Sequence, residues 1–324
     1  MLEGDLIMKA VLIDKPMKAE EIFLREVEMP TVKSGWVLVK IFAFGLNHSE
    51  KILRHGEILE NYIQKPVIPG IECVGEIFDA SDTNFKVGEK VVALMGGMGR
   101  SFNGSYAEFA LLPAHHVFSV KSSLSWENLA AIPETFFTAW GSLFECLRLK
   151  KNDEILIRGA TCALGYAAIQ IAKNFGAKVI ATTHKKEKFS LLEDADEIIL
   201  DDGKLSGKIL VDKVLDLVGP KNLRDSLKIV KPSENAFVCN TGILGGEEFL
   251  QNFDAITEIP NGVYLTGFYS NTPTQEVIDK IFEFIEEKKI IPKVGAVFEF
   301  ENIRDALMAQ DYGKVNGKIV VKIC

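Results

Sequence analysis

The sequence predicts an α/β protein with a doubly wound parallel sheet and a second, β-rich domain. Two observations predict this class. From residue 154 onward, short apolar segments alternate with segments of helical periodicity, as in parallel sheets whose strands are connected by helices. Residues 8–125 instead contain short strand candidates separated by proline and glycine. The length of 324 residues suits two domains.

The most informative segment reads as strand, tight turn, helix and strand. Glu154–Ile157 is a short apolar run typical of a buried parallel strand, and the turn 159–165 follows it. A helical pattern then continues to Gly176, and Lys178–Thr182 forms the second strand. Such a turn points backbone N–H groups and the positive end of a helix at an anion. We therefore expect it to bind the pyrophosphate of a dinucleotide.

The turn departs from the usual G-x-G-x-x-G pattern of dinucleotide-binding proteins. Gly165 is the last glycine of that pattern, but Ala160 and Cys162 occupy the two earlier glycine positions. An ordinary buried strand–helix corner is the alternative interpretation. The candidate cofactor-binding residues of the turn are Ala160, Thr161, Cys162, Ala163, Leu164 and Gly165.

Further elements follow from apolar periodicity. In the N-terminal part the strand candidates are Met8–Ile13, Leu24–Val27, Val37–Phe44, Cys73–Ile77, Lys90–Ala93 and Ala107–Leu112. Beyond the turn they are Glu197–Leu200, Lys213–Val218, Ala236–Thr241, Gly262–Phe268, Val297–Phe300 and Gly317–Ile323. Helices are expected at Trp126–Ile132, Thr138–Leu147, Thr274–Lys289 and Ile303–Gln310, with Pro133 interrupting the first helical region.

Composition excludes several classes of function. The net charge of −8 and the lack of a basic stripe argue against nucleic-acid binding. No apolar run approaches the roughly 20 residues of a membrane span. The first residues lack the basic region of a secretory signal, and the five cysteines are widely scattered. These features predict a cytoplasmic protein with reduced thiols.

Seven short stretches, taken together, resemble the medium-chain dehydrogenase/reductase superfamily, specifically its zinc-independent quinone oxidoreductase branch. They cover nearly the whole chain in the same order: Phe44–Asn47, Pro69–Gly75, Gly88–Val91, Gly104–Glu108, Thr138–Trp140, the turn 159–165 and Gly317–Val320. The resemblance implies a GroES-like β-barrel catalytic domain, residues 1–125 and 268–324, and a Rossmann domain, residues 126–267. It also implies an active site between the two domains and a homodimer through strand Gly262–Phe268.

The metal ligands of zinc-using relatives are replaced in this chain. Their Gly-x-Cys-His-x-Asp/Glu motif has Asn47 at the Cys position, before His48 and Glu50. Their Gly-His-Glu motif has Ile71 at the His position, and their third ligand falls near Glu134. Because zinc needs three or four converging N, S or O ligands, we expect no metal.

The end of the second strand favours NADPH over NADH. An NAD site normally carries Asp or Glu there, about 20 residues past the turn. This chain has Thr182 and Thr183 instead, followed by lysines, of which Lys188 is the best candidate for a 2′-phosphate. A solvated helix start is the alternative interpretation of these lysines. The resemblance implies further cofactor contacts from Val218, Thr241, Gly242, Phe268 and Asn316.

The expected reaction is hydride transfer from NADPH to a quinone or an α,β-unsaturated carbonyl compound. Without a metal to polarise a plain carbonyl, an acceptor that is already electron-poor is favoured. The candidates for polar contacts are Asn47, Thr135 and Thr138, with His48 a further candidate. Alternatives are an enoyl-thioester or haloacrylate-type reductase, and a catalytically quiet NADPH-binding protein with a structural or regulatory role.

Overall fold

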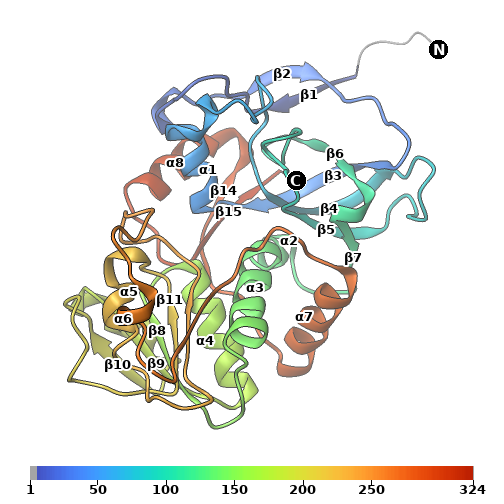
Figure 1. Ribbon diagram of the computed structural model, residues 1–324. Coiled ribbons are helices and arrows are strands. Elements are labelled where there is room, and N and C mark those ends of the chain that lie inside the picture. The colour runs from blue at the N-terminus through green and yellow to red at the C-terminus, as the bar shows by residue number, and fades with distance from the viewer. Residues whose placement is uncertain (1–5, 324) are drawn as a thin grey trace. The chain divides into compact units, whose positions relative to one another are not determined.

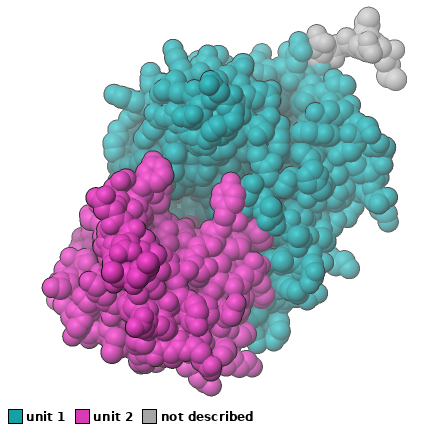
Figure 2. Space-filling model, viewed as in Figure 1, with its two compact units in different colours: residues 1–134, 271–324 teal, residues 135–270 magenta. Residues whose placement is uncertain are grey.

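The chain forms two units, which differ in the kind of sheet that they contain. A computed structural model describes residues 6–323, and Met1–Asp5 and Cys324 lie outside the described residues (Figure 1). Unit 1 comprises residues 1–134 and 271–324, and unit 2 comprises residues 135–270 (Figure 2). The domain boundaries expected from the sequence, after residues 125 and 267, fall nine and three residues earlier than these, since the units divide after residues 134 and 270.

Unit 1 is organised around the ten-residue strand β3 (Trp36–Gly45). This strand pairs with β4 (Glu72–Asp79) on one edge, and with β6 (Phe109–Pro113) and β15 (Lys318–Lys322) on the other. The sheet is completed by β5 (Lys90–Leu94), β7 (Val117–Ser119) and β14 (Val294–Glu299), and β1 (Ile7–Ala10) pairs separately with β2 (Arg25–Glu28). The C-terminal strand thus joins a sheet built mostly from the first 120 residues.

The helices of unit 1 are α1 (His48–His55), α2 (Trp126–Leu129), α7 (Gln275–Lys288) and α8 (Ile303–Asp311). Thr274 caps α7 by accepting a hydrogen bond from the Val277 backbone, and Lys289 ends the helix in the left-handed conformation. The sequence analysis did not predict α1 or β7. Helix α1 is short and mostly polar, although Asn47 and Glu50 form a capping box that marks its start.

Unit 2 contains a six-stranded, all-parallel sheet. Its spatial order is β10-β9-β8-β11-β12-β13, which is the doubly wound arrangement with a switch point between β8 and β11. The strands are β8 (Glu154–Arg158), β9 (Lys178–Thr183), β10 (Glu197–Leu200), β11 (Lys213–Asp216), β12 (Phe237–Asn240) and β13 (Tyr264–Gly267). The strand predictions for this unit are therefore confirmed to within two residues at each end.

A row of buried aliphatic side chains crosses the parallel sheet. Leu156 on β8 lies in register with Ile180 on one side and Val214 on the other, and Val214 pairs with Val238. All four side chains are almost completely buried in the core of unit 2. Their burial on a sheet covered by helices explains the short apolar runs within these strands.

Pro133 begins a helix rather than interrupting one, which corrects the expectation for residues 126–147. Helix α3 spans Pro133–Trp140, because proline at a first helical position sacrifices no backbone hydrogen bond. The chain then continues as the π-helix η4 (Gly141–Cys146). The predicted Thr138–Leu147 helix is therefore two segments of different pitch.

The connections of unit 2 are α4 (Ala163–Phe175), α5 (Pro220–Ser226), α6 (Ala255–Glu258) and the 3₁₀ segment η5 (Lys186–Leu192). Strand β13 is the last strand of the sheet and exposes Tyr264. The homodimer expected through this edge stays a prediction. No helix within residues 6–323 is both long enough and apolar enough to span a bilayer.

Candidate functional site

The turn between β8 and α4 closes tightly around Gly165. A Cβ atom at this position would lie 2.2 Å from the carbonyl oxygen of Ala160, so the turn requires glycine. Cys162 caps α4, because its sulfur accepts a hydrogen bond from the Gly165 backbone at 3.3 Å. Ala163 and Leu164 form the first turn of the helix. The turn thus presents a helix N-terminus to the carboxyl edge of the sheet.

A pocket of about 590 Å³ opens directly above this turn. Its walls come from residues at or just after the carboxyl ends of five neighbouring strands, which are all the strands of the parallel sheet except β13. The pocket therefore lies at the switch point. Its volume falls within the usual range for small-molecule sites. The lining residues are Gly159, Thr161, Cys162, Thr182, Thr183, His184, Asp201, Asp202, Gly203, Val218, Lys221, Asn222, Leu244 and Gly245.

The two threonines at the end of β9 hold the local backbone. The Thr182 hydroxyl accepts a hydrogen bond from the Gly159 backbone at 3.1 Å, and Thr183 accepts one from the Lys185 backbone at 3.3 Å. Both side chains are almost fully buried, although both residues line the pocket. Lys188 lies in η5 and is half-buried. Thr182 and Thr183 therefore shape the pocket wall, and their contact with a phosphate stays a prediction.

Arg158 fixes the floor of this region. Its guanidinium is fully buried and makes ion pairs with Asp201 at 2.7 Å and Asp225 at 3.0 Å. It also donates to the hydroxyl of Ser226 at 3.0 Å. Because Asp201 follows β10 and Asp225 lies in α5, one cation connects β8 with both sides of the switch point. The pairing also offsets the negative charge of Asp201 at the pocket wall.

The remaining candidate residues are divided between the pocket wall, the interior of unit 2 and unit 1. Val218 lines the pocket, and Gly242 lies so close to the Leu217 carbonyl that a Cβ atom would sit 2.3 Å from it. Thr241 instead bonds the Ser142 hydroxyl at 3.0 Å, and the Phe268 ring packs in the space that Gly141 leaves. Thr135 and Thr138 are buried on α3, and Asn47 and Asn316 belong to unit 1.

Two cationic or titratable pocket residues were missed by the sequence analysis. His184 follows Thr183 directly, and Lys221 is the second residue of α5. The sequence could have indicated both residues, because the carboxyl ends of parallel strands lie at one edge of the sheet. Residues that follow β11 should therefore have been considered together with those that follow β9. Asp202 also lines the pocket, but Lys208 pairs with its carboxylate at 2.8 Å.

Unit 1 contains a buried polar cluster centred on the Lys318 ammonium. The Lys318 Nζ lies 2.6 Å from Glu72 Oε1 and 2.6 Å from Asn47 Oδ1. The Asn47 amide also donates to Glu72 Oε1 at 2.7 Å, and Glu72 Oε2 accepts the Glu134 backbone N–H at 2.8 Å. Lys318 and Glu72 are 2 % and 0 % exposed, and a Cβ at Gly45 would clash with both. Both polar ends of Asn47 are thus engaged within this cluster.

Glu50 lies beside this cluster and is also buried. Its carboxylate accepts backbone hydrogen bonds from Asn47 at 2.9 Å and from Ile71 at 3.1 Å. Burial nevertheless dominates and raises the pKa of Glu50 to about 7, although the backbone bonds and Lys318 act in the opposite direction. Burial lowers the pKa of the nearby His48. Glu50 therefore titrates close to neutral pH.

The raised pKa of Glu50 predicts a pH-dependent stability. In the unfolded chain the carboxyl ionises near 4.5, whereas in the folded chain it ionises near 7. The folded state therefore binds more protons between these values, and stability falls as the pH rises from about 4.5 to 7, by roughly 3 kcal/mol. We expect Glu50→Gln to remove most of this fall. Urea unfolding at pH 5 and pH 8, followed by tryptophan fluorescence, measures it.

The fluorescence of unit 1 can be isolated for this experiment. Trp140 is the one tryptophan of the three that lies in unit 2, so a Trp140→Phe background leaves Trp36 and Trp126 in unit 1. Glu283→Gln, on the exposed face of α7, is the matched control and should keep the full pH dependence. An unchanged pH dependence in Glu50→Gln would show that Glu50 is not the titrating group.

The residues of the polar cluster do not fit a zinc ion. Asn47 and Glu72 offer oxygen atoms, but those atoms already bind an ammonium at 2.6 Å. Ile71 contributes a backbone N–H and no ligand atom. Among residues 6–323, no group of three or more His, Cys, Asp and Glu side chains is arranged to hold a metal ion. The Lys318 ammonium thus supplies the positive charge that Asn47 and Glu72 bind.

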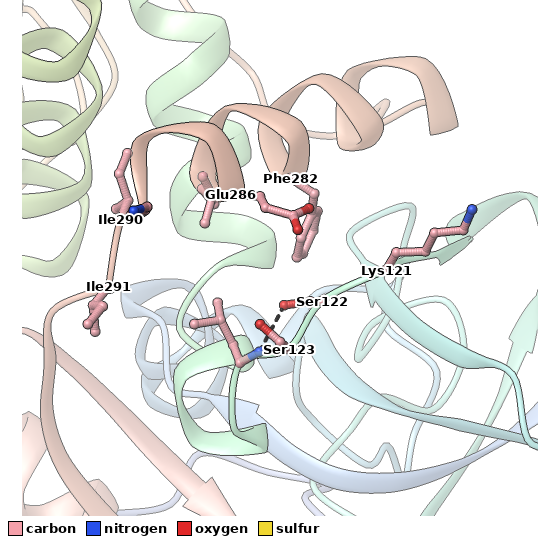
Figure 3. Close-up of a pocket in the computed structure, with 10 residues that line it drawn as sticks. Lys121, Ser122, Ser123, Phe282, Glu286, Ile290 and Ile291 are labelled. Carbon is pink, nitrogen blue, oxygen red and sulfur yellow. Dashed lines mark hydrogen bonds between the residues drawn. The ribbon is translucent and has the colours of Figure 1, made fainter.

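A separate pocket of about 360 Å³ in unit 1 lies between the C-terminal half of α7 and residues 121–124. Figure 3 shows its aliphatic and aromatic walls, including Phe282, Ile290 and Ile291, and shows Lys121 extending away from them. Ser122 accepts a hydrogen bond from the Leu124 backbone at 3.2 Å, which fixes the loop.

Comparison with known proteins identifies the family. A sequence profile described as alcohol dehydrogenase GroES-like domain matches residues 33–122, and one described as zinc-binding dehydrogenase matches residues 194–321. The chain is 30% identical to the quinone oxidoreductase of Rattus norvegicus, across 71% of this chain and 72% of the rat protein. It belongs to the medium-chain dehydrogenase/reductase superfamily, in the quinone oxidoreductase branch.

Other relatives match over most of this chain. Human quinone oxidoreductase is 29% identical over 94% of both chains. The chain spans 65% of a longer relative, the zebrafish synaptic vesicle membrane protein VAT-1 homolog, at 25% identity. The fold resembles the structure of the quinone oxidoreductase from Coxiella burnetii, with a TM-score of 0.82, 23% identity, and coverage of 98% of this chain and 100% of that one.

Membership of the superfamily confirms the fold class and the type of activity. The sheet of unit 1 is GroES-like, and that of unit 2 is a Rossmann sheet. The protein is an oxidoreductase, and members of the superfamily generally bind NAD(P). The turn closed at Gly165 and the pocket at the switch point have the helix N-terminus and the size that such a cofactor requires.

Proposed function

We propose that the protein is an NADPH-dependent, zinc-independent reductase that transfers hydride to a quinone or an α,β-unsaturated carbonyl compound. The observation that carries this proposal is the unit 2 pocket, which combines the closed turn at Gly165 with the converging strand ends. When bound there, NADPH supplies the hydride. The turn 159–165 binds the pyrophosphate, and Val218 and Gly242 shape the adjoining wall.

The preference for NADPH is supported by the charges around the pocket. No carboxylate occupies the end of β9, where Thr182, Thr183 and His184 lie instead. Asp201 is neutralised by Arg158, and Asp202 is paired with Lys208. Lys188 and Lys221 supply positive charge that suits a 2′-phosphate.

The choice of acceptor follows from the polar cluster of unit 1. Because Asn47 and Glu72 bind the Lys318 ammonium, the protein has no Lewis acid at these positions to polarise a plain carbonyl. Acceptors that are already electron-poor are therefore preferred. Asn47, Thr135 and Thr138 stay the candidates for polar contacts with such an acceptor.

The proposal predicts NADPH oxidation with quinones or enones that survives removal of metals. The measurement is NADPH absorbance with a panel of a benzoquinone, a naphthoquinone, an enone and an enoyl thioester, before and after exhaustive chelation. We expect turnover with a quinone or the enone, unchanged by the chelator. Loss of activity that zinc restores would overturn the zinc-independent mechanism. Turnover with the thioester alone would favour an enoyl-thioester reductase, and binding without turnover a catalytically quiet protein.

A further inference from the structure

The carboxylate of Asp201 lies at the same edge of the parallel sheet as the turn 159–165. Asp201 follows β10, and its backbone N–H donates to the Thr183 carbonyl of the neighbouring strand β9 at 2.9 Å. It lines the unit 2 pocket together with Thr182 and Thr183. In sites that bind NAD, a carboxylate at the end of the strand corresponding to β9 accepts a hydrogen bond from the ribose 2′-OH. The pocket therefore contains a carboxylate one strand away from that position.

Both oxygen atoms of the Asp201 carboxylate are already occupied by donors. Oδ2 accepts hydrogen bonds from Arg158 Nε at 2.7 Å and from the Thr182 hydroxyl at 3.4 Å. Oδ1 accepts hydrogen bonds from Arg158 Nη2 at 3.0 Å and from the Gly203 backbone N–H at 2.9 Å. Because a carboxylate offers about four lone-pair sites, these bonds leave none for a ribose hydroxyl. Arg158 supplies the shorter of the two bonds at Oδ2 and the only positive charge among these donors.

The Arg158 guanidinium is held in place from its other side by α5. Its Nη1 atom donates to the Ser226 hydroxyl at 3.0 Å and to the Asn222 carbonyl at 3.3 Å, and it lies 3.0 Å from the Asp225 carboxylate. A guanidinium is planar and its donors have a fixed arrangement, so these contacts also fix the two nitrogen atoms that face Asp201. The Arg158 side chain is 0 % exposed and is not among the residues that line the pocket. It therefore acts on the pocket through Asp201.

An unpaired carboxylate at Asp201 would change which nucleotide the pocket accepts. Its negative charge would repel a 2′-phosphate, and its free lone pairs would accept a hydrogen bond from a 2′-OH. Thr182 connects this carboxylate directly with the turn, because its hydroxyl donates to Asp201 and accepts the Gly159 backbone N–H at 3.1 Å. The state of Asp201 thus acts beside the residues that are proposed to bind the 2′-phosphate.

We propose that Arg158 determines the preference of the pocket for NADPH, because it occupies the Asp201 carboxylate. This inference rests on the proposed function and assigns its nucleotide specificity to a buried residue. Arg158 is a positioning residue, since it acts through Asp201 and does not line the pocket. With Arg158 in place, Asp201 is not available to the 2′-OH of NADH. Without it, the pocket gains the acidic group that the end of β9 lacks.

The test compares the equilibrium affinities for NADPH and for NADH in the whole chain and in its Arg158→Gln variant. Glutamine removes the positive charge but still offers an amide N–H group to Asp201. We expect the ratio of the two affinities to shift toward NADH by at least about tenfold, because the 2′-phosphate then meets an uncompensated negative charge. A merely structural role of Arg158 would weaken both nucleotides alike and leave this ratio unchanged. Fluorescence of the bound nicotinamide measures both affinities.

Two further variants separate the role of Asp201 from a general change of charge. Adding Asp201→Asn to Arg158→Gln removes the unpaired carboxylate and should restore most of the preference for NADPH. Arg224→Gln is the matched control, because it removes the same charge from unit 2. Arg224 pairs with Glu258, and neither residue lines the pocket, so this variant should keep the wild-type ratio.

Asp201→Asn alone decides the question if Arg158→Gln does not fold. It leaves the guanidinium with Asp225 as its remaining ion-pair partner, so the preference for NADPH should rise at least about twofold. An equal or lower preference in this variant would overturn the role of Arg158, as would an unchanged ratio in Arg158→Gln or a shift that Asp201→Asn does not reverse. A wild-type protein without a preference for NADPH would contradict the proposed function as well. A wild-type preference that Arg158→Gln retains would contradict only this inference.

Discussion

Replacement of Lys318 by methionine is expected to destabilise unit 1 by about 3–5 kcal/mol. Methionine preserves much of the side-chain volume but removes the ammonium that binds Glu72 and Asn47. The Glu72 carboxylate is 0 % exposed, so it would remain buried without a compensating cation. Lys9→Met is the matched control. It breaks a surface pair with Glu301 at a similar distance, 3.0 Å, and should cost little, because solvent screens an exposed ion pair.

The measurement is urea unfolding of unit 1 in the Trp140→Phe background. A second variant separates loss of charge balance from loss of packing. Adding Glu72→Gln to Lys318→Met removes the unpaired carboxylate and should recover part of the stability. A cost for Lys318→Met no larger than that of Lys9→Met would mean that the buried cluster is not balanced by this ammonium.

Replacement of Gly165 by alanine is expected to open the turn between β8 and α4 and to weaken cofactor binding. The added methyl would lie 2.2 Å from Ala160 O and 2.6 Å from Ala160 C, which are backbone atoms that cannot move aside independently. We expect destabilisation of about 1–3 kcal/mol, as in other overpacked sites. Displacing the helix N-terminus should also reduce NADPH affinity at least about tenfold, or ~1.4 kcal/mol.

Gly56→Ala serves as the control for this substitution. No atom lies within 4 Å of a Cβ built on Gly56, and its φ of −165° is accessible to alanine. Both variants should be titrated with NADPH and unfolded by heat. Gly165→Ala with unchanged affinity would show that the turn does not hold the dinucleotide.

The strands and the cofactor turn could be predicted because their physical signals are local. The short apolar runs at β8, β9 and β11 reflect burial on both faces, and Gly176 ends α4 at a φ of +105°. The switch point also follows, because the order of alternating strands and helices defines a doubly wound sheet. These features depend on residues that are close together in the chain.

The polar cluster and the π-helix η4 could not be predicted in the same way. Asn47, Glu72 and Lys318 are separated by up to 271 positions, and each reads alone as an ordinary polar residue. The segment Gly141–Cys146 is a π-helix, whereas the apolar pattern there predicted a regular helix. For Thr182 and Thr183 the sequence predicted the position at the end of β9. It did not predict that both hydroxyls accept hydrogen bonds from the backbone.

The most direct test of the account is an equilibrium titration of the reduced protein with NADPH and with NADH. The account places a pyrophosphate at the turn 159–165 and a 2′-phosphate beyond β9. It therefore predicts saturable binding of both nucleotides, with NADPH bound at least about tenfold more tightly. Equal affinities would contradict the phosphate assignment of Thr182, Thr183 and Lys188. Failure of both nucleotides to bind would contradict the dinucleotide site itself.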